Sequence, residues 1–444
     1  MASVARNKWG LSYKARRATY VAVTQQIITY GCKVWGYRVS NAHIKRKLLL
    51  IQRLAAIYVA RAYRTALTDG LLAIANLMPV DLLIAERYIS YNMRKLDEKK
   101  ITKEDCDKKV APFVVGDVIP NLSTLIMEKG LDITTPLNLH PATNKNYEIS
   151  LDNYNQTSNS INIYTDGSHT DDGTKGAIVI HTTTGKTTYQ KYFRLANYSS
   201  KNQAESLAIW KAIECVTNNS GKLKGSEIII NTDSRVALHQ ISKGNTKLPI
   251  IKNILCVLDT LRTPIILKWI RGHSGIKGNE QADLLARKAI TNLKDSTYDK
   301  IPLSWVRKNL HTYFIGRWQF QWNNSNTGRT VHRFLPSITD RKKYHHFIPN
   351  YELTQLITGH GNLRSYLARF LNKGDGLCPC PLASWEDSEH ILCYCQLYNK
   401  ERKTIISAAL EENIAWPCTF DCLISNKKLY EALIKFIKNI KIFN

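Results

Sequence analysis

Four acidic residues, Asp166, Glu205, Asp233 and Asp283, stand where packing alone would not place an acid. Asp166 and Asp233 each end a short predicted strand. If these two strands run parallel and adjacent, both acids lie at one edge of a sheet, where ligands bind in open α/β sheets. Taken singly, each aspartate also fits as the cap of a turn or helix.

Glu205 and Asp283 lie on predicted helices. Glu205 shares a helical face with Ala208 and Ala212, the face that should pack on the sheet. An ionised carboxylate buried there needs a partner or a metal ion. Asp283 shares a face with Ala286, and a partly exposed helix acid is an equal alternative for it.

Four converging carboxylates would repel one another unless divalent cations lay between them. Carboxylate oxygens suit Mg²⁺, with Mn²⁺ as a substitute, rather than Zn²⁺. Two such ions can clamp an in-line phosphoryl displacement. His273, in the loop Gly272–Gly275, could orient water or shuttle protons, although a lone loop histidine can also be merely solvated.

The elements that must position these residues form one predicted α/β domain over 161–290. Alternating or apolar runs predict five strands, and helical spacing predicts three helices. The strands cover residues 161–165, 176–182, 187–194, 228–232 and 265–270, and the helices 200–217, 234–242 and 278–290. Residues 1–100 are predicted to be helical, 101–160 an irregular connector, and 301–444 mainly helical around a Cys/His cluster at 378–395.

The net charge, the cysteine count and the apolar segments limit the classes of protein to which this chain can belong. The 444 residues carry a formal charge of +26, of which residues 1–100 supply 18 Lys and Arg against five Asp and Glu. Such a surface attracts polyanions, although a merely soluble basic protein or an anionic membrane surface fits the charge equally. Ten cysteines are too few for a disulfide scaffold, and no signal peptide or uninterrupted apolar span is present. We therefore expect an intracellular protein, nuclear or cytoplasmic, that is neither secreted nor inserted in a membrane.

The segment 161–290 resembles a type I ribonuclease H domain. The matching motifs are Tyr164–Ser168 (YTDGS), Gln203–Glu205 (QAE), Thr232–Ser234 (TDS) and Gly272–Asp283 (GHSGIKGNEQAD). The resemblance implies a five-stranded mixed sheet with flanking helices. It implies catalytic, metal-binding roles for Asp166, Glu205, Asp233 and Asp283, and a helper role for His273. It also implies cleavage of the RNA strand of RNA–DNA hybrids, leaving 3′-hydroxyl and 5′-phosphate ends.

One position departs from the family, since Arg271 stands where many relatives have a proline before the Gly-His pair. This loosens the predicted loop and adds charge to it. Asn202 and Gln203 are candidates for sensing the 2′-hydroxyl that separates RNA from DNA. The alternative for both is an ordinary polar first turn of the helix.

The flanks resemble the tail of a reverse transcriptase from non-LTR retrotransposons of the R1 or I kind. The similar segments are Ile28–Gly36 (ITYGCKVWG), Leu50–Arg53 (LIQR) and Tyr63–Thr65 (YRT). Residues 1–100 would then be a thumb-like remnant. The Tyr-x-Asp-Asp signature of the polymerase is absent, because the only adjacent pair, Asp171-Asp172, follows His169-Thr170. We expect no polymerase activity.

Cys378, Cys380, His390 and Cys395 form a candidate zinc site that resembles the C-terminal Cys-Cys-His-Cys motif of these retrotransposons. Cys393 could replace Cys395, and reduced cysteines around a helix start are the alternative. An aromatic and basic group, Trp305, Arg317, Trp318 and Trp322, fits a helix core better than base stacking.

The function predicted from sequence is two-metal-ion hydrolysis of the RNA strand of RNA–DNA hybrids. The expected partner is nucleic acid, with no membrane and no small-molecule substrate. The alternative is a catalytically silent nucleic-acid-binding remnant of a retroelement. The intact carboxylate set favours the enzyme, and the missing polymerase signature favours the remnant.

Overall fold

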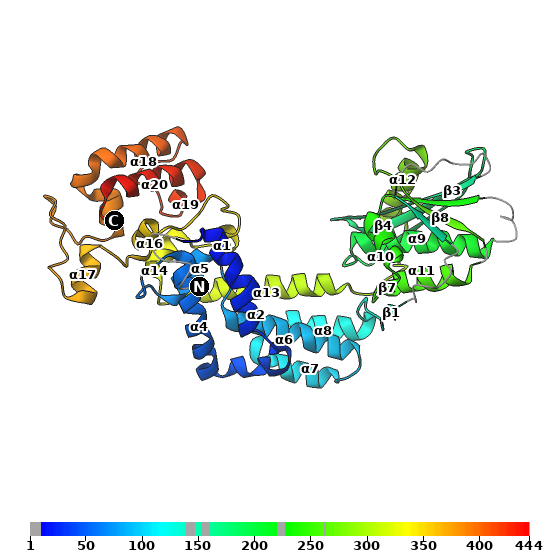
Figure 1. The fold of residues 1–444 in the computed structure, drawn as a ribbon, viewed down its shortest axis with the longest axis horizontal. Coiled ribbons are helices and arrows are strands. Elements are labelled where there is room, and N and C mark those ends of the chain that lie inside the picture. The colour runs from blue at the N-terminus through cyan, green and yellow to red at the C-terminus, as the bar shows by residue number, and fades with distance from the viewer. Residues whose placement is uncertain (1–9, 139–146, 152–159, 220–226, 262, 444) are drawn as a thin grey trace. The chain divides into compact units, whose positions relative to one another are not determined.

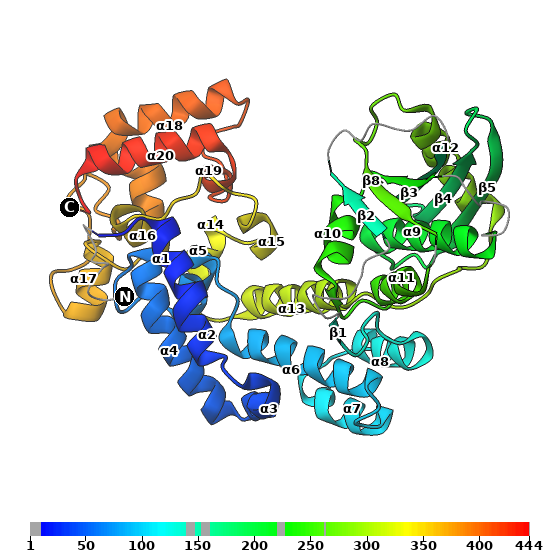
Figure 2. The same ribbon diagram turned by 45° about the vertical axis from the view of Figure 1, so that its right-hand side comes forward.

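The computed structural model describes residues 10–138, 147–151, 160–219, 227–261 and 263–443 (Figure 1; Figure 2). The chain divides into two compact units. The first consists of Met1–Asn92, Lys108–Val115 and Leu310–Asn444, and the second of Met93–Asp107 and Gly116–Asn309.

A mixed sheet with the order β2-β8-β6-β3-β4-β5 forms the centre of the second unit. Its strands are β2 (Tyr147–Ser150), β3 (Ser160–Thr170), β4 (Gly173–His181), β5 (Thr187–Leu195), β6 (Glu227–Thr232) and β8 (Ile265–Trp269). Strands β3, β4 and β5 pair antiparallel, whereas β3, β6, β8 and β2 pair parallel. The predicted mixed sheet is confirmed, with β2 as a sixth strand beyond the five predicted.

Helices cover both faces of this sheet (Figure 1). They are α9 (Lys201–Asn218), α10 (Arg235–Lys243), α11 (Pro249–Thr260) and α12 (Lys277–Asn292). The sheet has one hydrophobic core on each face, and strand β4 contributes to both. Ile178 joins the core under α9, α10 and α11, while Ala177 and Val179 pack against α12. Alternate residues of a strand point to opposite faces, so an apolar strand such as β4 serves two cores.

Helix α11 and the helices of the connector were not predicted from the sequence. Residues 101–160 contain α7 (Lys103–Val110) and α8 (Val118–Lys129), so the segment is not irregular throughout as predicted. A two-stranded sheet of β1 (Leu137–Asn138) and β7 (Asn245–Thr246) joins the connector to the segment between α10 and α11. Part of the predicted connector, 139–146 and 152–159, lies outside the described residues.

The first unit is helical and is built from both ends of the chain. Buried Arg341 shows this, because its guanidinium donates to Tyr13 Oη at 3.1 Å and to Ile74 O at 2.9 Å. Its longer helices are α1 (Tyr13–Thr19), α4 (Ala42–Ala60), α5 (Thr68–Ala75), α16 (Tyr351–Thr358), α17 (Arg364–Leu371), α18 (Asn399–Glu411) and α20 (Lys427–Ile440). Shorter ones are α2 (Gln25–Ile28), α3 (Cys32–Trp35), α14 (Arg329–Phe334), α15 (Ile338–Arg341) and α19 (Cys422–Ser425). Helices α6 (Val80–Asp97) and α13 (Leu303–Asn324) have residues in both units. The helical character predicted for 1–100 and 301–444 is confirmed over the described residues 10–100 and 301–443.

The predicted aromatic group on α13 is not one cluster. Trp318 and Trp322 are buried in the first unit, in agreement with the helix-core interpretation. Trp305 belongs to the second unit, where its ring centroid lies 5.5 Å from that of Tyr198.

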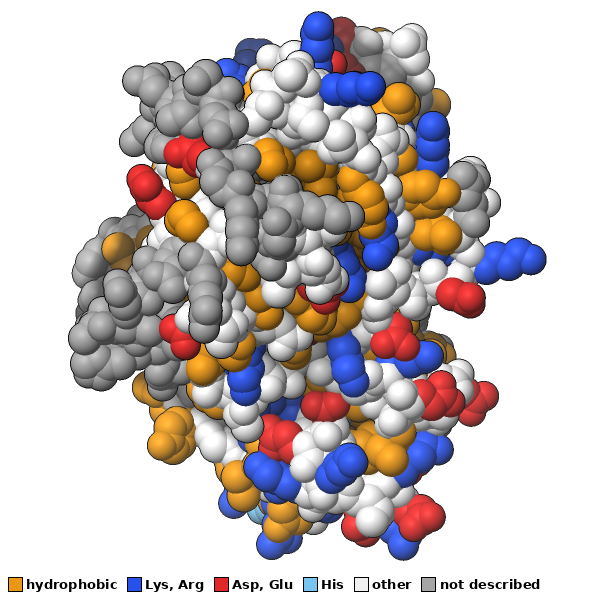
Figure 3. Space-filling model, turned by 90° about the vertical axis from the view of Figure 1, so that its right-hand side faces the viewer, with side chains coloured by type: hydrophobic (Ala, Val, Ile, Leu, Met, Phe, Trp, Pro, Cys, Tyr) orange, Lys and Arg blue, Asp and Glu red, His pale blue; other side chains and the backbone are white. Residues whose placement is uncertain are grey.

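Among the described residues, no single helix has the length and apolar character to cross a membrane; by those two criteria alone, the bent pair of α5 and α6 passes. On the face of the second unit that Figure 3 presents, Lys and Arg side chains are interspersed with Asp and Glu.

Candidate active site

Asp166 and Asp233 are brought together by the parallel pairing of β3 and β6. The last pair in this ladder is Thr165 with Thr232, so the two aspartates follow it on adjacent strands. The predicted juxtaposition at one sheet edge is therefore present. Asp166 does not end its strand as predicted, because β3 continues to Thr170 through pairing with β4. That second pairing fixes the backbone on both sides of Asp166.

Glu205 reaches the same place from α9. Ser200 caps this helix and forms a capping box with Gln203, which sets where the helix begins. Gly167 allows α9 to approach β3 closely, since a Cβ there would lie 2.3 Å from Glu205 N. Glu205 is 6% exposed, as its position on the apolar face predicted. The carboxylate is therefore buried beside the strand that carries Asp166.

Asp283 comes from the opposite face of the sheet, on α12. The first turn of α12 packs on Tyr164, because a Cβ at Gly278 would lie 2.2 Å from the Tyr164 ring. Asp283 is half-buried, and its Oδ2 accepts from Arg287 Nη2 at 2.7 Å. Arg287 is 63% exposed, so Asp283 has a solvent-facing cation as its partner.

The four carboxylates interact electrostatically. Burial, together with the charges of Asp233, Asp283 and Glu205, raises the pKa of Asp166 to about 7, against the lowering effect of Lys201. Burial also raises the pKa of Glu205, opposed by hydrogen bonding from Ser234 and by Lys201. The structure thus brings the other three predicted acids within electrostatic range of Asp166. The repulsion and burial that raise the pKa of Asp166 are offset only in part by Lys201.

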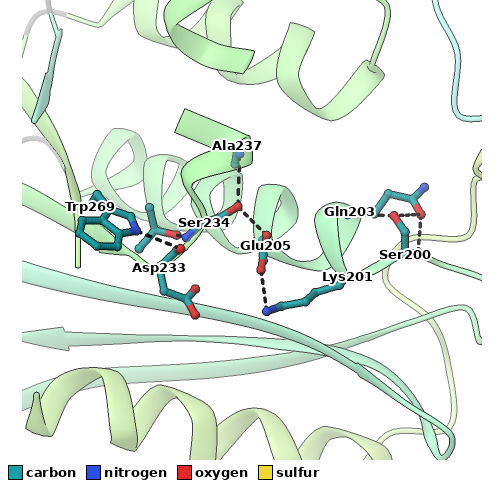
Figure 4. Close-up of polar contacts among 9 residues, drawn as sticks. Ser200, Lys201, Gln203, Glu205, Asp233, Ser234, Ala237 and Trp269 are labelled. Carbon is teal, nitrogen blue, oxygen red and sulfur yellow. Dashed lines mark hydrogen bonds and ion pairs between the residues drawn. The ribbon is translucent and has the colours of Figure 1, made fainter. Parts of the chain in front are cut away.

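Both oxygens of Glu205 have partners (Figure 4). Ser234 Oγ donates to Oε2 at 2.5 Å, and Lys201 Nζ lies 3.2 Å from Oε1. For Lys201, burial alone would lower the pKa of the ammonium, but Glu205, Asp233 and Asp166 together raise it. This lysine is therefore a cation that faces three of the four acids.

The donor set suits a hard divalent cation. Asp166 Oδ2 and Asp233 Oδ1 are buried and have no hydrogen-bond partner among the described residues. Buried, unpartnered carboxylate oxygens are costly, and oxygen donors of this kind are the ligands that Mg²⁺ takes. Asp166 and Asp233, with Glu205 and Asp283 beside them, therefore fit a magnesium site.

Comparisons with known proteins agree with this geometry. The family model described as RNase H matches residues 158–291. Residues 158–291 are an RNase H domain.

The chain is also similar to proteins of the type-1 retrotransposable element R1. It is 28% identical over 200 residues to a "Retrovirus-related Pol polyprotein" of R1 from Popillia japonica, a match covering 45% of this chain and 77% of that relative. It is 34% identical over 99 residues to a "Putative 115 kDa protein" of R1DM from Drosophila melanogaster, covering 22% of this chain and 10% of the relative. It is 33% identical over 125 residues to an R1 Pol polyprotein from Nasonia vitripennis, covering 27% and 29%. The predicted RNase H domain, in a chain related to a non-LTR retrotransposon, is confirmed.

Among solved structures, the chain is similar to LC11-RNase H1, isolated from compost, with a TM-score of 0.26 and 23% identity. That match covers 30% of this chain and 96% of the other. A crystal structure of LC11-RNase H1 in complex with an RNA/DNA hybrid matches with a TM-score of 0.26 and 24% identity, covering 30% and 97%.

The loop with His273 borders the acids of the RNase H domain. A Cβ at Gly272 would lie 2.9 Å from Asp233 Oδ2, so the loop backbone touches this carboxylate. His273 itself is exposed, with a positive φ of 52°. The residue before His273 therefore lies close to Asp233, while the imidazole of His273 is open to solvent.

The two candidates for 2′-hydroxyl sensing differ in environment. Gln203 is 6% exposed, and its Nε2 donates to Asp132 Oδ2 at 2.7 Å while its Oε1 accepts from Ser200 N at 2.8 Å. These contacts support the alternative of a structural first turn for Gln203. Asn202 is exposed, and its role in sensing the 2′-hydroxyl stays a prediction.

Three residues that contact Glu205 or Asp233 were not predicted from the sequence to take part in this site. Lys201 lies four residues before Glu205, a spacing that predicts a helical ion pair. Ser234 is the helix cap of α10 as well as the donor to Glu205. Trp269 Nε1 donates to Asp233 O at 3.2 Å, and no sequence pattern signals that contact (Figure 4).

Asp166 makes the stability of the metal-free protein depend on pH. Its pKa of about 7 lies above the ordinary value of 3.8, so the folded protein keeps a proton that the unfolded chain has lost. Stability therefore falls as pH rises from about 4 through about 7. Relative to wild type, Asp166→Asn should gain unfolding free energy over this range, reaching on the order of 3 kcal/mol, and level off above it. Urea unfolding in Mg²⁺-free buffers between pH 5 and 8 measures the difference, and a difference independent of pH would contradict it.

The predicted Cys/His cluster also assembles. The ligand atoms of Cys378, Cys380, His390 and Cys395 all lie within 4.8 Å of one another, and all four residues are buried. Cys378 Sγ is 3.6 Å from Cys395 Sγ, and Cys380 Sγ is 3.5 Å from His390 Nε2. Of the two alternatives left open by the sequence, the structure brings Cys395 into the set.

Proposed function

We propose that the RNase H domain hydrolyses the RNA strand of RNA–DNA hybrids with two divalent metal ions. The observation that carries the proposal is the convergence of four carboxylates from β3, α9, β6 and α12, two of which have buried, unpartnered oxygens. A bound Mg²⁺ pair would activate the attacking water and neutralise charge on the leaving oxygen.

The protein residues have distinct parts in this proposal. Asp166 and Asp233 offer the free oxygens that hold cations, and Glu205 and Asp283 complete the ligand set. Ser234 orients Glu205 through its hydrogen bond. His273 accepts or returns a proton at its exposed ring, since its loop touches Asp233 and opens to solvent.

A second candidate function is a catalytically silent nucleic-acid-binding remnant of a retroelement. The sequence supports it by lacking a Tyr-x-Asp-Asp signature while carrying a charge of +26. Under either function we propose that the chain has no polymerase activity. Nucleotide incorporation in a primer-extension assay would disprove that part.

A cleavage assay on a labelled RNA–DNA hybrid decides between the enzyme and the catalytically silent remnant. The full chain is incubated with an RNA–DNA duplex, the RNA labelled at its 5′ end, in Mg²⁺ or Mn²⁺, with the matching DNA duplex as control. The enzyme proposal expects RNA fragments ending in a 3′-hydroxyl, with the downstream fragments carrying a 5′-phosphate, and no cut in DNA. A chain that binds the hybrid but leaves it intact in both metals would establish the silent remnant.

We also propose a structural zinc ion at Cys378, Cys380, His390 and Cys395. Three sulfur donors and one imidazole nitrogen in a closed, buried set are typical of structural zinc sites. Burial raises the pKa of the Cys378 thiol to about 12, so a cation that stabilises the thiolate would favour the folded cluster.

Cys380→Ser should remove this zinc and destabilise the first unit by several kcal/mol, because structural zinc binding contributes directly to folding. Metal analysis should find about one zinc per wild-type chain and none in the variant. Cys256→Ser, at an exposed cysteine of α11, is the matched control and should keep the zinc. Wild-type protein purified without zinc, with unchanged stability on adding it, would reject the site.

A further inference from the structure

Lys201 places an ammonium group within the acidic cluster. It is the first residue of α9, and its side chain is 58% exposed while that of Glu205 is 7% exposed. The lysine therefore extends from solvent to reach a buried carboxylate. In Figure 4 its amino group points to Glu205 on the side where the carboxylate of Asp233 lies.

Helix stability does not explain this lysine. A cation in the first turn opposes the helix dipole, and fixing a long side chain costs conformational entropy. The favourable contribution comes from the cluster, where Lys201 interacts with Glu205, Asp233 and Asp166. Lys201 is therefore stabilised at this position by its interaction with the acids and not by the dipole of α9.

The ion pair also occupies the oxygen that a metal would need. Glu205 Oε2 accepts from Ser234, and Glu205 Oε1 faces Lys201 Nζ. A divalent cation that takes Glu205 through Oε1 must displace the ammonium, and the two positive charges repel each other at short range. Because the Lys201 side chain is 58% exposed, it can move into solvent without repacking the core.

We propose that Lys201 is a displaceable internal counter-cation that competes with the divalent metal for Glu205. It neutralises part of the cluster while the site is empty and raises the metal concentration needed to fill it. This inference rests on the proposed metal-dependent function.

Calorimetric titration of the full chain with MgCl₂ at fixed ionic strength tests the proposal. Lys201→Met, which keeps the length and removes the charge, should bind Mg²⁺ roughly tenfold more tightly than wild type. Lys201→Gln, a second neutral variant, should do the same, and Lys201→Arg should stay within about twofold of wild type because it keeps the charge. Circular dichroism confirms that each variant is folded.

Lys211→Met is the matched control. Lys211 lies on the same helix and pairs with Glu214 at 2.7 Å, so its loss removes an equal charge and a similar ion pair outside the cluster. It should leave Mg²⁺ affinity within about twofold of wild type. Unchanged or weaker Mg²⁺ binding in both neutral Lys201 variants would overturn the role of Lys201. Absence of Mg²⁺ binding by wild type and every variant would instead overturn the proposed metal site itself.

Discussion

Asp166→Asn should abolish cleavage of the RNA–DNA hybrid while leaving hybrid binding intact. Asp166 lies at the centre of the cluster, where it interacts with Asp233, Asp283 and Glu205, and its Oδ2 is buried and unpartnered. An amide of the same shape removes the charge that holds the cation. Metal-ion stabilisation of this kind contributes several kcal/mol, so the cleavage rate should fall about a thousandfold or more.

The same variant should also be more stable than wild type without metal at neutral pH, because the buried charge is gone. Loss of activity with a gain in stability is a pattern that misfolding cannot produce. Asp172→Asn, at an exposed acid in the turn after β3, is the matched control and should retain activity. Cleavage by Asp166→Asn at the wild-type rate would remove Asp166 from the mechanism.

Gly167→Ala should cost about 3 kcal/mol of stability and most of the activity. A Cβ at this position would lie 2.3 Å from Glu205 N and 2.5 Å from Ala204 C, and both are backbone atoms that cannot rotate away. The helix must then move off β3, and overpacking of a close contact costs up to about 3 kcal/mol. Because α9 carries Glu205, the same movement separates this carboxylate from Asp166. Chemical denaturation and the hybrid cleavage assay measure the two effects.

Gly316→Ala on α13 is the control for this substitution. A Cβ there meets nothing within 4 Å, and alanine favours helix over glycine, so the variant should gain up to about 1 kcal/mol. Equal stability of Gly167→Ala and wild type would mean that α9 does not lie against β3 as described.

Local sequence patterns were sufficient to predict most strands and helices of the RNase H domain. Alternation and apolar runs located β3 to β6 and β8, and Glu205 on an apolar face predicted its burial. Helix α11 was missed although Ile250, Ile254 and Leu258 have helical spacing, so its signal was present in the sequence. Strand β2 has four residues and exists through pairing with β8, a contact between segments more than a hundred residues apart.

The sequence by itself determined which four acids form the site, because an acid on a core-facing position is costly wherever the chain folds. It also determined the Cys/His set apart from the choice between Cys393 and Cys395. Only the tertiary structure decided which carboxylate oxygens of these acids have hydrogen-bond or ion-pair partners. Asp166 and Asp233 keep free oxygens, whereas Glu205 is held by Ser234 and Lys201. The reason is physical: hydrogen bonds and charge interactions depend on ångström separations between distant segments, which strand register and helix packing set and local residue patterns do not encode.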